Sequence, residues 1–127
     1  MNTTAPKLFQ PLTFPNGKTV PNRLCKAAME ENLSDEGQIP GDRLHRLYRS
    51  WVEGGVGLII TGNVVVAPDA LTGPGGVVLK ESTDIEPFKR WAEAGKSKDG
   101  QFWMQINHPG RQVYAAMGET ALSPSDK

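Results

Sequence analysis

Three segments of this 127-residue sequence place polar residues just after short apolar runs. These segments are residues 27–30, 61–63 and 105–111. In α/β folds ligands bind beyond the carboxyl ends of the strands, so such positions are candidates for binding or catalysis. Gln105 offers both an amide donor and an acceptor, which suits a heteroaromatic edge that carries C=O and N–H groups. Small residues in the first two segments would let a flat ligand approach the backbone, and Arg111 could serve an anion.

The strands that must position these segments are short and apolar. Residues 11–20 predict a hairpin, because Asn16-Gly17 is a strong two-residue turn signal. Residues 24–28, 56–60 and 102–106 each predict a strand. The continuous apolarity of the second strand indicates burial on both faces, which is typical of parallel sheets.

Two amphipathic segments between these strands predict helices. Apolar residues recur at spacings of three and four over residues 44–52, which places them on one helix face. Asp42 is the expected N-cap, and the glycine pair at 54–55 is the expected end. For the second helix, Thr83 and Glu86 match a capping box. The residues expected to line this second helix are Ile85, Phe88, Lys89 and Ala92.

The order hairpin, strand, helix, strand, helix, strand spans residues 1–127 and predicts an α/β fold with a parallel sheet. Three parallel strands with two helices leave a sheet edge and a sheet face uncovered. Such a unit looks like part of something larger. A complete eight-stranded (β/α) barrel needs at least roughly 200 residues, so this chain cannot contain one.

The same segments resemble motifs of the old yellow enzyme family of flavin-dependent oxidoreductases, and they follow the family's order. Residues 22–29 look like the family's opening strand, and residues 57–62 look like its second strand. Residues 105–111 carry its Gln-x-x-His-x-Gly-Arg pattern, and residues 8–20 are similar to its N-terminal lid. The resemblance spans nearly the whole chain but covers only roughly the first third of the family's barrel.

This resemblance implies an FMN-binding (β/α)₈ barrel, of which the chain would be the N-terminal βαβαβ portion with a preceding hairpin. It implies reduction of activated C=C bonds of α,β-unsaturated carbonyl compounds, with NAD(P)H as the reductant. Matched residue by residue, the resemblance implies contacts along the isoalloxazine ring of FMN and at the pyrimidine edge of that ring. The residues implied are Ala27, Ala28, Met29, Glu30, Asn63 and Gln105.

Other implied parts of the enzyme lie outside this sequence. The Glu30 position is often Thr or Cys in the family, so a carboxylate there would change the surroundings of the flavin. The family's substrate-anchoring His residues, its proton-donating Tyr and its phosphate-binding loops belong to later strands. We therefore expect no catalytic residue here and no activity from the chain alone. A complementary polypeptide that carries the remaining strands, or self-association through open edges, would be its partner.

Composition excludes several other classes. Fourteen Lys and Arg residues balance fourteen Asp and Glu residues, so no basic stripe favours nucleic acid. The longest apolar stretch, residues 56–60, is too short to span a membrane, and no signal peptide is visible, so we expect a cytoplasmic protein. Two histidines and one cysteine lie far apart, which argues against a metal site. Cys25 is expected in the core.

Three further points stay open to other interpretations. The glycine-rich residues 73–76 lack phosphate-loop spacing and are read as an ordinary loop. The adjacent carboxylates of Glu30 and Glu31 are more typical of a solvated pair than of a catalytic one. The chain could also be a non-catalytic binding or assembly module on a βαβαβ scaffold, since fold does not fix function, or one piece of a split enzyme.

Overall fold

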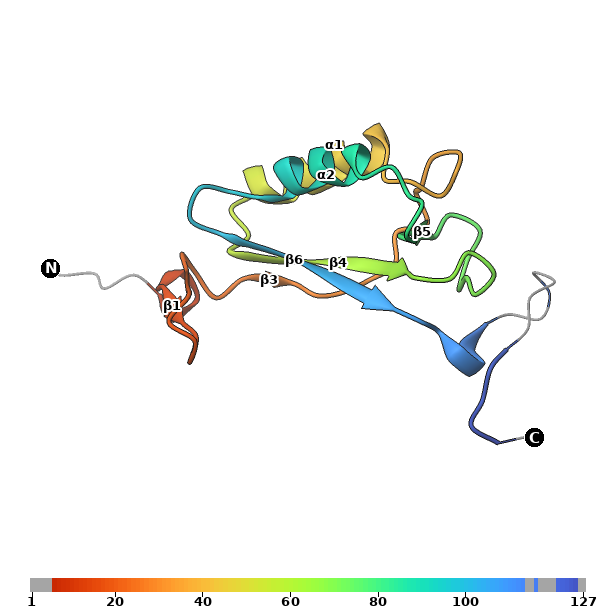
Figure 1. Ribbon diagram of the computed structural model, residues 1–127. Coiled ribbons are helices and arrows are strands. Elements are labelled where there is room, and N and C mark those ends of the chain that lie inside the picture. Colours follow the sequence, from red (N-terminus) through yellow and green to blue (C-terminus); the bar gives the residue numbers. More distant parts are fainter. Residues whose placement is uncertain (1–5, 114–115, 117–120, 126–127) are drawn as a thin grey trace, which may run out of the picture.

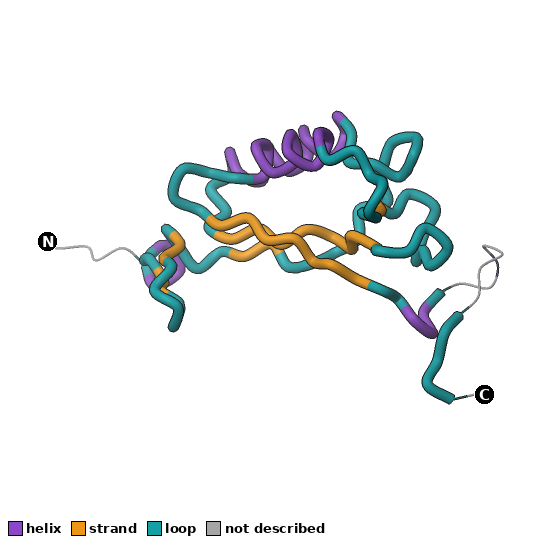
Figure 2. The backbone as a smooth tube through the Cα atoms, viewed as in Figure 1, coloured by secondary structure: helices purple, strands orange, loops and turns teal. Residues whose placement is uncertain are grey.

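The structure, a computed structural model, describes residues 6–113, 116 and 121–125. Two helices cover one face of a parallel sheet, and a small hairpin lies at one end of it (Figure 1). The tube in Figure 2 shows that the opposite face of the sheet carries no helix in the described part of the chain. The elements are η1 (Lys7–Phe9), β1 (Leu12–Thr13), β2 (Thr19–Val20), β3 (Cys25–Lys26), α1 (Asp42–Glu53), β4 (Leu58–Val65), β5 (Val77–Val78), α2 (Glu86–Gly95), β6 (Gln101–Asn107) and η2 (Gly110–Gln112).

Strand β4 is the centre of the sheet, and all its pairings are parallel. Along one edge it pairs with β3 near its start, where Cys25 lies opposite Leu58, and with β5 at its end. Along the other edge it pairs with the whole length of β6. The strands therefore run in one direction, and the carboxyl ends of β4, β5 and β6 meet at one end of the sheet. The sequence did not predict β5, because its two valines follow a glycine-rich loop.

Strand β4 extends further than predicted and contains a bulge. Two of its residues, Thr61 and Gly62, lie opposite the single β6 residue Met104. A bulge interrupts the ladder and leaves a backbone group without its strand partner. The Thr61 hydroxyl supplies the missing partner, because its Oγ1 accepts the backbone N–H of Gln105 at 2.9 Å. The strand thus continues through the bulge and brings Asn63 into register with Gln105.

The core lies between the helices and the sheet, and Tyr48 of α1 is at its centre. The ring of Tyr48 is fully buried and makes edge contacts with Trp51, Trp91 and Phe102, at centroid distances of 4.9, 5.0 and 5.7 Å. Aromatic pairs in this geometry stabilise the core beyond simple burial. The buried residues of this cluster are Leu44, Tyr48, Ile59, Val64, Val77, Phe88 and Trp91.

Helix α1 begins one residue earlier than predicted, because its N-cap is Gly41 and not Asp42. Asp42 is its first residue, and Gly41 is the N-cap without a side-chain hydrogen bond. The side chain of Asp35 packs against Gly41 and occupies the space that a Cβ would need. A capping side chain at position 41 is therefore excluded by the neighbouring loop, and Asp42 acts only as an acidic residue in the first turn.

Helix α2 differs from the prediction in both its cap and its buried face. Thr83 Oγ1 accepts the N–H of Lys80, and Asp84 Oδ1 accepts the N–H of Glu86, so no capping box forms. Phe88 is buried as expected. The predicted Ile85, Lys89 and Ala92 are exposed, and Trp91 and Ala94 are buried instead. Burial of the large aromatic rings determines the rotation of the helix, because they remove the most apolar area from water.

The N-terminal hairpin has a three-residue loop in place of the two-residue turn that Asn16-Gly17 predicts. Leu12 pairs with Val20, and the N–H of Phe14 donates to the carbonyl of Lys18 at 2.8 Å. Gly17 closes the loop at a φ of 81°, in the left-handed region that glycine adopts without strain.

Cys25 is exposed, contrary to the expectation from its apolar neighbours. Successive side chains on a strand alternate between the two faces of the sheet. The adjacent Lys26 points under the helices and is buried, so Cys25 lies on the uncovered face. Among the described residues no helix is long and apolar enough to cross a bilayer, and no cluster of three His, Cys, Asp or Glu could hold a metal ion.

Candidate flavin-binding site

The structure brings the three predicted segments together at the carboxyl end of the sheet. Asn63 of β4 and Gln105 of β6 are register partners on neighbouring strands. The segment after β3 passes directly over Gly62, where an added Cβ would lie 3.0 Å from Glu30 Cα and even nearer the Met29 carbonyl oxygen. Only glycine permits this approach, so the bulge residue sets how closely the first two segments meet.

A cavity of about 500 Å³ opens at this end of the sheet. Two predicted site residues, Glu30 and Asn63, line it, and Arg111 of η2 lines it as well. Its remaining described lining residues are Thr72, Gln112 and Val113.

The other four predicted cofactor residues are not among the described residues that line this cavity. Met29 is 59% exposed, and Ala27 is also exposed. Ala28 and Gln105 are half-buried. Of these four, Gln105 is placed next to the cavity by its pairing with Asn63.

Thr72 is a site residue that sequence reasoning missed. Its hydroxyl donates to Glu30 Oε2 at 2.7 Å, and Asn63 Nδ2 lies 3.5 Å from the same hydroxyl. The other carboxylate oxygen, Glu30 Oε1, is buried and has no hydrogen-bond partner among the described residues. A buried acceptor without a donor is costly, so this oxygen favours a donor from a ligand or solvent. The only sequence signal for Thr72 was its place in the loop after β4.

The glycine-rich loop that contains Thr72 packs against the chain after Glu31. Ser34 N–H donates to the Gly75 carbonyl at 3.0 Å. An added Cβ at Gly75 would lie 2.9 Å from Asn32 Cα and nearer still to its carbonyl, so glycine is needed for backbone contact. The loop therefore packs against residues 32–34, just after Glu30 and Glu31, and Gly75 is needed for this packing.

The sequence offers His108 and Arg111 as residues that could serve an anion or a proton. Arg111 lines the cavity, whereas His108 is not among its described lining residues. His108 is exposed, and its Nδ1 accepts the N–H of Gly110 at 3.1 Å. Gly110 has a φ of 56°. His108 therefore shapes the turn that carries Arg111 toward the cavity.

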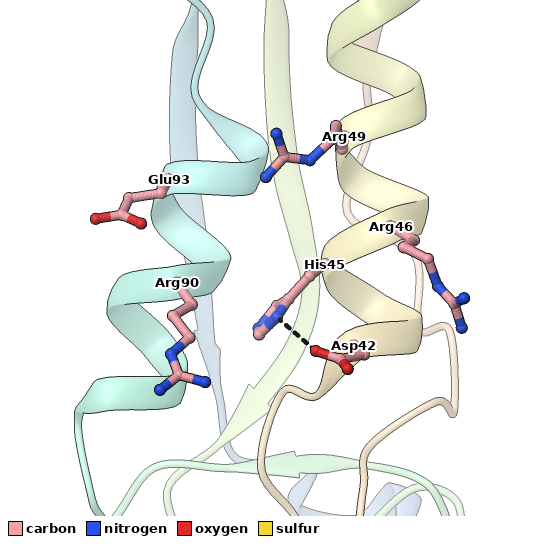
Figure 3. Close-up of a pocket in the computed structure, with 6 residues that line it drawn as sticks. All are labelled: Asp42, His45, Arg46, Arg49, Arg90 and Glu93. Carbon is pink, nitrogen blue, oxygen red and sulfur yellow. Dashed lines mark ion pairs between the residues drawn. The ribbon is translucent and has the colours of Figure 1, made fainter.

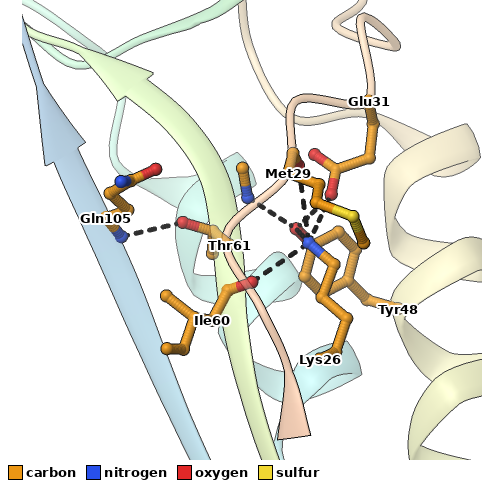
Figure 4. A network of polar contacts seen from close by, with 8 residues as sticks. Lys26, Met29, Glu31, Tyr48, Ile60, Thr61 and Gln105 are labelled. Carbon is orange, nitrogen blue, oxygen red and sulfur yellow. Dashed lines mark hydrogen bonds and ion pairs between the residues drawn. The ribbon is translucent and has the colours of Figure 1, made fainter.

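A buried polar cluster lies beneath the site, between the sheet and α1 (Figure 4). Lys26 Nζ and Glu31 Oε1 are 2.7 Å apart, and their side chains are only 6% and 12% exposed. The Tyr48 hydroxyl donates to the same Glu31 oxygen at 2.9 Å and accepts the N–H of Gly62 at 3.1 Å. Glu31 is thus an internal ion-pair partner, which corrects the expectation of a solvated pair of carboxylates at 30 and 31.

The phenol of Tyr48 stays neutral in this cluster. Burial raises the pKa of Tyr48 well above its usual value, and the negative charge of Glu31 raises it further. A neutral hydroxyl can donate to Glu31 and accept from Gly62 at the same time. Lys26 Nζ adds a bond to the Ile60 carbonyl at 3.0 Å, so the cluster reaches β4 at two backbone groups.

A second cavity, of about 440 Å³, lies between the outer sides of α1 and α2 (Figure 3). Its lining residues are Asp42, His45, Arg46, Arg49, Arg90 and Glu93. His45 Nδ1 lies 3.8 Å from Asp42 Oδ1, and its Nε2 lies 3.2 Å from the Pro87 carbonyl oxygen. Arg49 points toward α2 whereas Arg46 points away from it (Figure 3), so the guanidinium groups do not converge on one ligand position.

Comparison with known proteins assigns the chain to a family. Residues 7–127 match the sequence model of the NADH:flavin oxidoreductase / NADH oxidase family. The NADH-dependent flavin oxidoreductase iliE of Hypocrea jecorina (strain QM6a) is 37% identical over 113 residues, which cover 85% of this chain and 28% of the relative. The probable NADH-dependent flavin oxidoreductase YqiG of Bacillus subtilis (strain 168) is 30% identical over 129 residues, covering 99% and 34%.

Solved structures show the same fold. The old yellow enzyme homologue from Zymomonas mobilis superposes with a TM-score of 0.80 at 23% identity, covering 96% of this chain and 34% of that one. Morphinone reductase in complex with tetrahydroNAD gives a TM-score of 0.77 at 24% identity, covering 94% and 33%. The predicted α/β fold is confirmed as part of a (β/α)₈ barrel, and the chain spans about a third of the length of these proteins. The family resemblance is confirmed as well: the chain belongs to the NADH:flavin oxidoreductase / NADH oxidase family.

Proposed function

We propose that this chain forms part of the FMN site of an oxidoreductase that uses NAD(P)H to reduce activated C=C bonds of α,β-unsaturated carbonyl compounds. One observation carries the proposal: residues 27–30, Asn63 and Gln105 converge at the carboxyl end of the sheet. Membership of a flavin oxidoreductase family supports the cofactor, and relatives named as NADH-dependent support a nicotinamide reductant.

The donor set fits the heterocyclic end of FMN. The amides of Asn63 and Gln105 are on neighbouring strands and offer donors and acceptors to C=O and N–H groups. The unpartnered Glu30 Oε1 offers a further acceptor. When bound, FMN supplies hydride transfer between the nicotinamide and the substrate.

In this proposal the chain's own residues bind and orient the ring. Thr61 fixes the backbone of Gln105 through the 2.9 Å hydrogen bond, so its amide is presented from a rigid strand. Thr72 restrains the Glu30 carboxylate and thereby keeps one wall of the cavity in place. Arg111 adds a positive charge to the cavity lining.

The remaining parts of the enzyme would come from the strands that complete the barrel. Within the described residues, β6 pairs only with β4 and carries exposed apolar side chains. Trp103 is 41% exposed, Met104 38% and Ile106 64%. We propose that polypeptide carrying the remaining strands covers this surface and supplies the phosphate and enone contacts. The 127-residue chain alone would then be inactive and would associate through β6.

Flavin titration tests the proposal. With ¹⁵N-labelled chain, millimolar FMN should shift the backbone amides of residues 27–30, Asn63 and Gln105. The amides of Arg46 and Arg90, on the far side of the helices, should stay in place. Absence of shifts at the strand ends, with a preparation that stays colourless even when the remaining strands and FMN are added, would favour the non-catalytic module. Submicromolar FMN binding with NADPH oxidation by the chain alone would overturn the need for further strands.

A further inference from the structure

We propose that Lys26, Glu31 and Tyr48 are positioning residues that lock the segment after β3 to the bulge of β4, and so set the shape of the flavin site. The role in the flavin site rests on the proposed function. The fixed position of the segment after β3 relative to the bulge of β4 does not depend on it. We call these three residues the clamp.

The clamp fills a gap in the sheet. Strand β3 pairs with β4 only at residues 58–59, and β5 pairs with it only at residues 64–65. Between these two pairings, β4 has no strand partner on that edge within the described part of the chain. Lys26 Nζ donates to the Ile60 carbonyl, and the Tyr48 hydroxyl accepts the Gly62 N–H, so two side chains replace the missing strand.

The clamp also holds the segment that crosses over this gap. Lys26 Nζ contacts Glu31 Oε1 at 2.7 Å and lies 3.5 Å from the Met29 carbonyl oxygen. Tyr48 reaches the same Glu31 oxygen from α1. Each of the two hubs, the ammonium group and the phenol, therefore binds both segments at once, and residues 27–30 cannot shift against Gly62 without breaking several bonds.

Stability alone does not account for this arrangement. A buried ion pair seldom stabilises a protein more than apolar side chains of similar volume, because both charges must be desolvated. Directional bonds instead specify one geometry. The geometry here is the one that places Glu30 beside Asn63 on the wall of the cavity.

The variant Tyr48→Phe isolates the clamp from the core. It keeps the ring that packs against Trp51 and Trp91 and removes only the hydroxyl. The matched control is Ser50→Ala on the same helix, whose hydroxyl bonds only carbonyls of its own helix, including Leu47 at 2.8 Å. Both are made in the full 127-residue chain, and amide hydrogen exchange and FMN-induced shifts are read by NMR.

Loss of one hydrogen bond should speed exchange of the Gly62 amide about tenfold in Tyr48→Phe. The FMN concentration that half-saturates the shifts of residues 27–30 should rise roughly tenfold. Exchange of the core amides of Ile59 and Val64 should match wild type, and Ser50→Ala should match it throughout. Unchanged exchange at Gly62, or uniform acceleration across β4 and β6, would overturn the clamp.

A second variant covers the case in which Tyr48→Phe does not fold. The double change Lys26→Met with Glu31→Gln leaves no unpaired buried charge and keeps an acceptor for the Tyr48 hydroxyl. It should speed exchange in residues 29–31 while Gly62 stays protected, and equal exchange in both regions would refute the assignment. If wild-type chain shows no FMN shifts and stays colourless when the remaining strands and FMN are added, the proposed function fails, whereas the exchange pattern still decides the clamp.

Discussion

Asn63 and Gln105 lie opposite each other in register only because β4 contains an extra residue before them. Without the bulge, alternation would place the following β4 side chains on the other face of the sheet. The bulge therefore selects which side chains reach the candidate site. The Thr61 hydroxyl stabilises it by accepting the Gln105 N–H at 2.9 Å, and Thr61 is fully buried.

Removal of the Thr61 hydroxyl should destabilise the chain by leaving the Gln105 N–H without its acceptor. We expect Thr61→Val to lower the free energy of unfolding by about 1–3 kcal/mol, since a buried donor is left unsatisfied. Urea denaturation followed by tryptophan fluorescence measures this. Thr61→Ser keeps the hydroxyl and serves as control. Equal stability of the Val variant and wild type would show that the ladder closes without the hydroxyl.

The raised pKa of Tyr48 predicts a loss of stability at alkaline pH. In the unfolded chain the phenol ionises near its ordinary pKa of 10.0, whereas in the folded chain it keeps its proton far above that. The unfolded state therefore binds fewer protons above pH 10, and the free energy of unfolding falls by up to about 1.4 kcal/mol per pH unit from this residue. Below pH 10 its contribution is constant.

The part of this stability loss that comes from Tyr48 is measured by comparison with Tyr48→Phe, which has no phenol at this position. Urea midpoints between pH 9 and 11 should fall more steeply for wild type than for the variant. Parallel pH profiles would contradict the raised pKa, because every other titrating group is common to both chains.

Breaking the buried ion pair should cost far more than breaking an exposed one. Lys26→Met leaves the Glu31 carboxylate buried without its 2.7 Å partner, and we expect a loss of about 3–5 kcal/mol. Arg43→Met is the comparison, because its 3.6 Å contact with Asp35 is largely exposed and is worth at most about 1 kcal/mol. Thermal unfolding of both variants gives the two losses. Similar losses would mean that solvent reaches the Lys26 pair.

Hydrophobic periodicity predicted the helices and the main strands, since burial of apolar side chains dominates those elements. It did not predict the contacts that define the site. Lys26 interrupts an apolar run and Glu31 lies in a polar loop, so neither pattern indicates that they meet under Tyr48. Their pairing depends on how α1 packs across β4, which is a tertiary relationship between residues far apart in the chain.

Predictions from local sequence patterns were also wrong or incomplete where contacts between residues distant in the chain determine the structure. Asp42 was predicted as a cap, but Asp35 packs against Gly41 and moves the helix start. The sequence did not indicate Thr72 as a site residue. The hydroxyl of Thr72 reaches Glu30 because the glycine-rich loop packs against Asn32, which is a tertiary contact. Cys25 was expected in the core, yet its strand has a helical layer on one face only.

The exposed apolar side chains of β6 should drive self-association of the isolated chain. Ile106 is 64% exposed on a strand that pairs only with β4 among the described residues, and such an edge recruits further strands. We expect Ile106→Lys to convert associated chain to monomer in sedimentation velocity, because a charge on this surface disfavours edge pairing. Ile85→Lys is the matched control, since Ile85 is 48% exposed at the N-cap of α2 and away from the sheet edge. If both variants reduce association equally, general solubility is responsible. If neither does, β6 is not the associating surface, and the proposed contact with the remaining strands loses its support in the isolated chain.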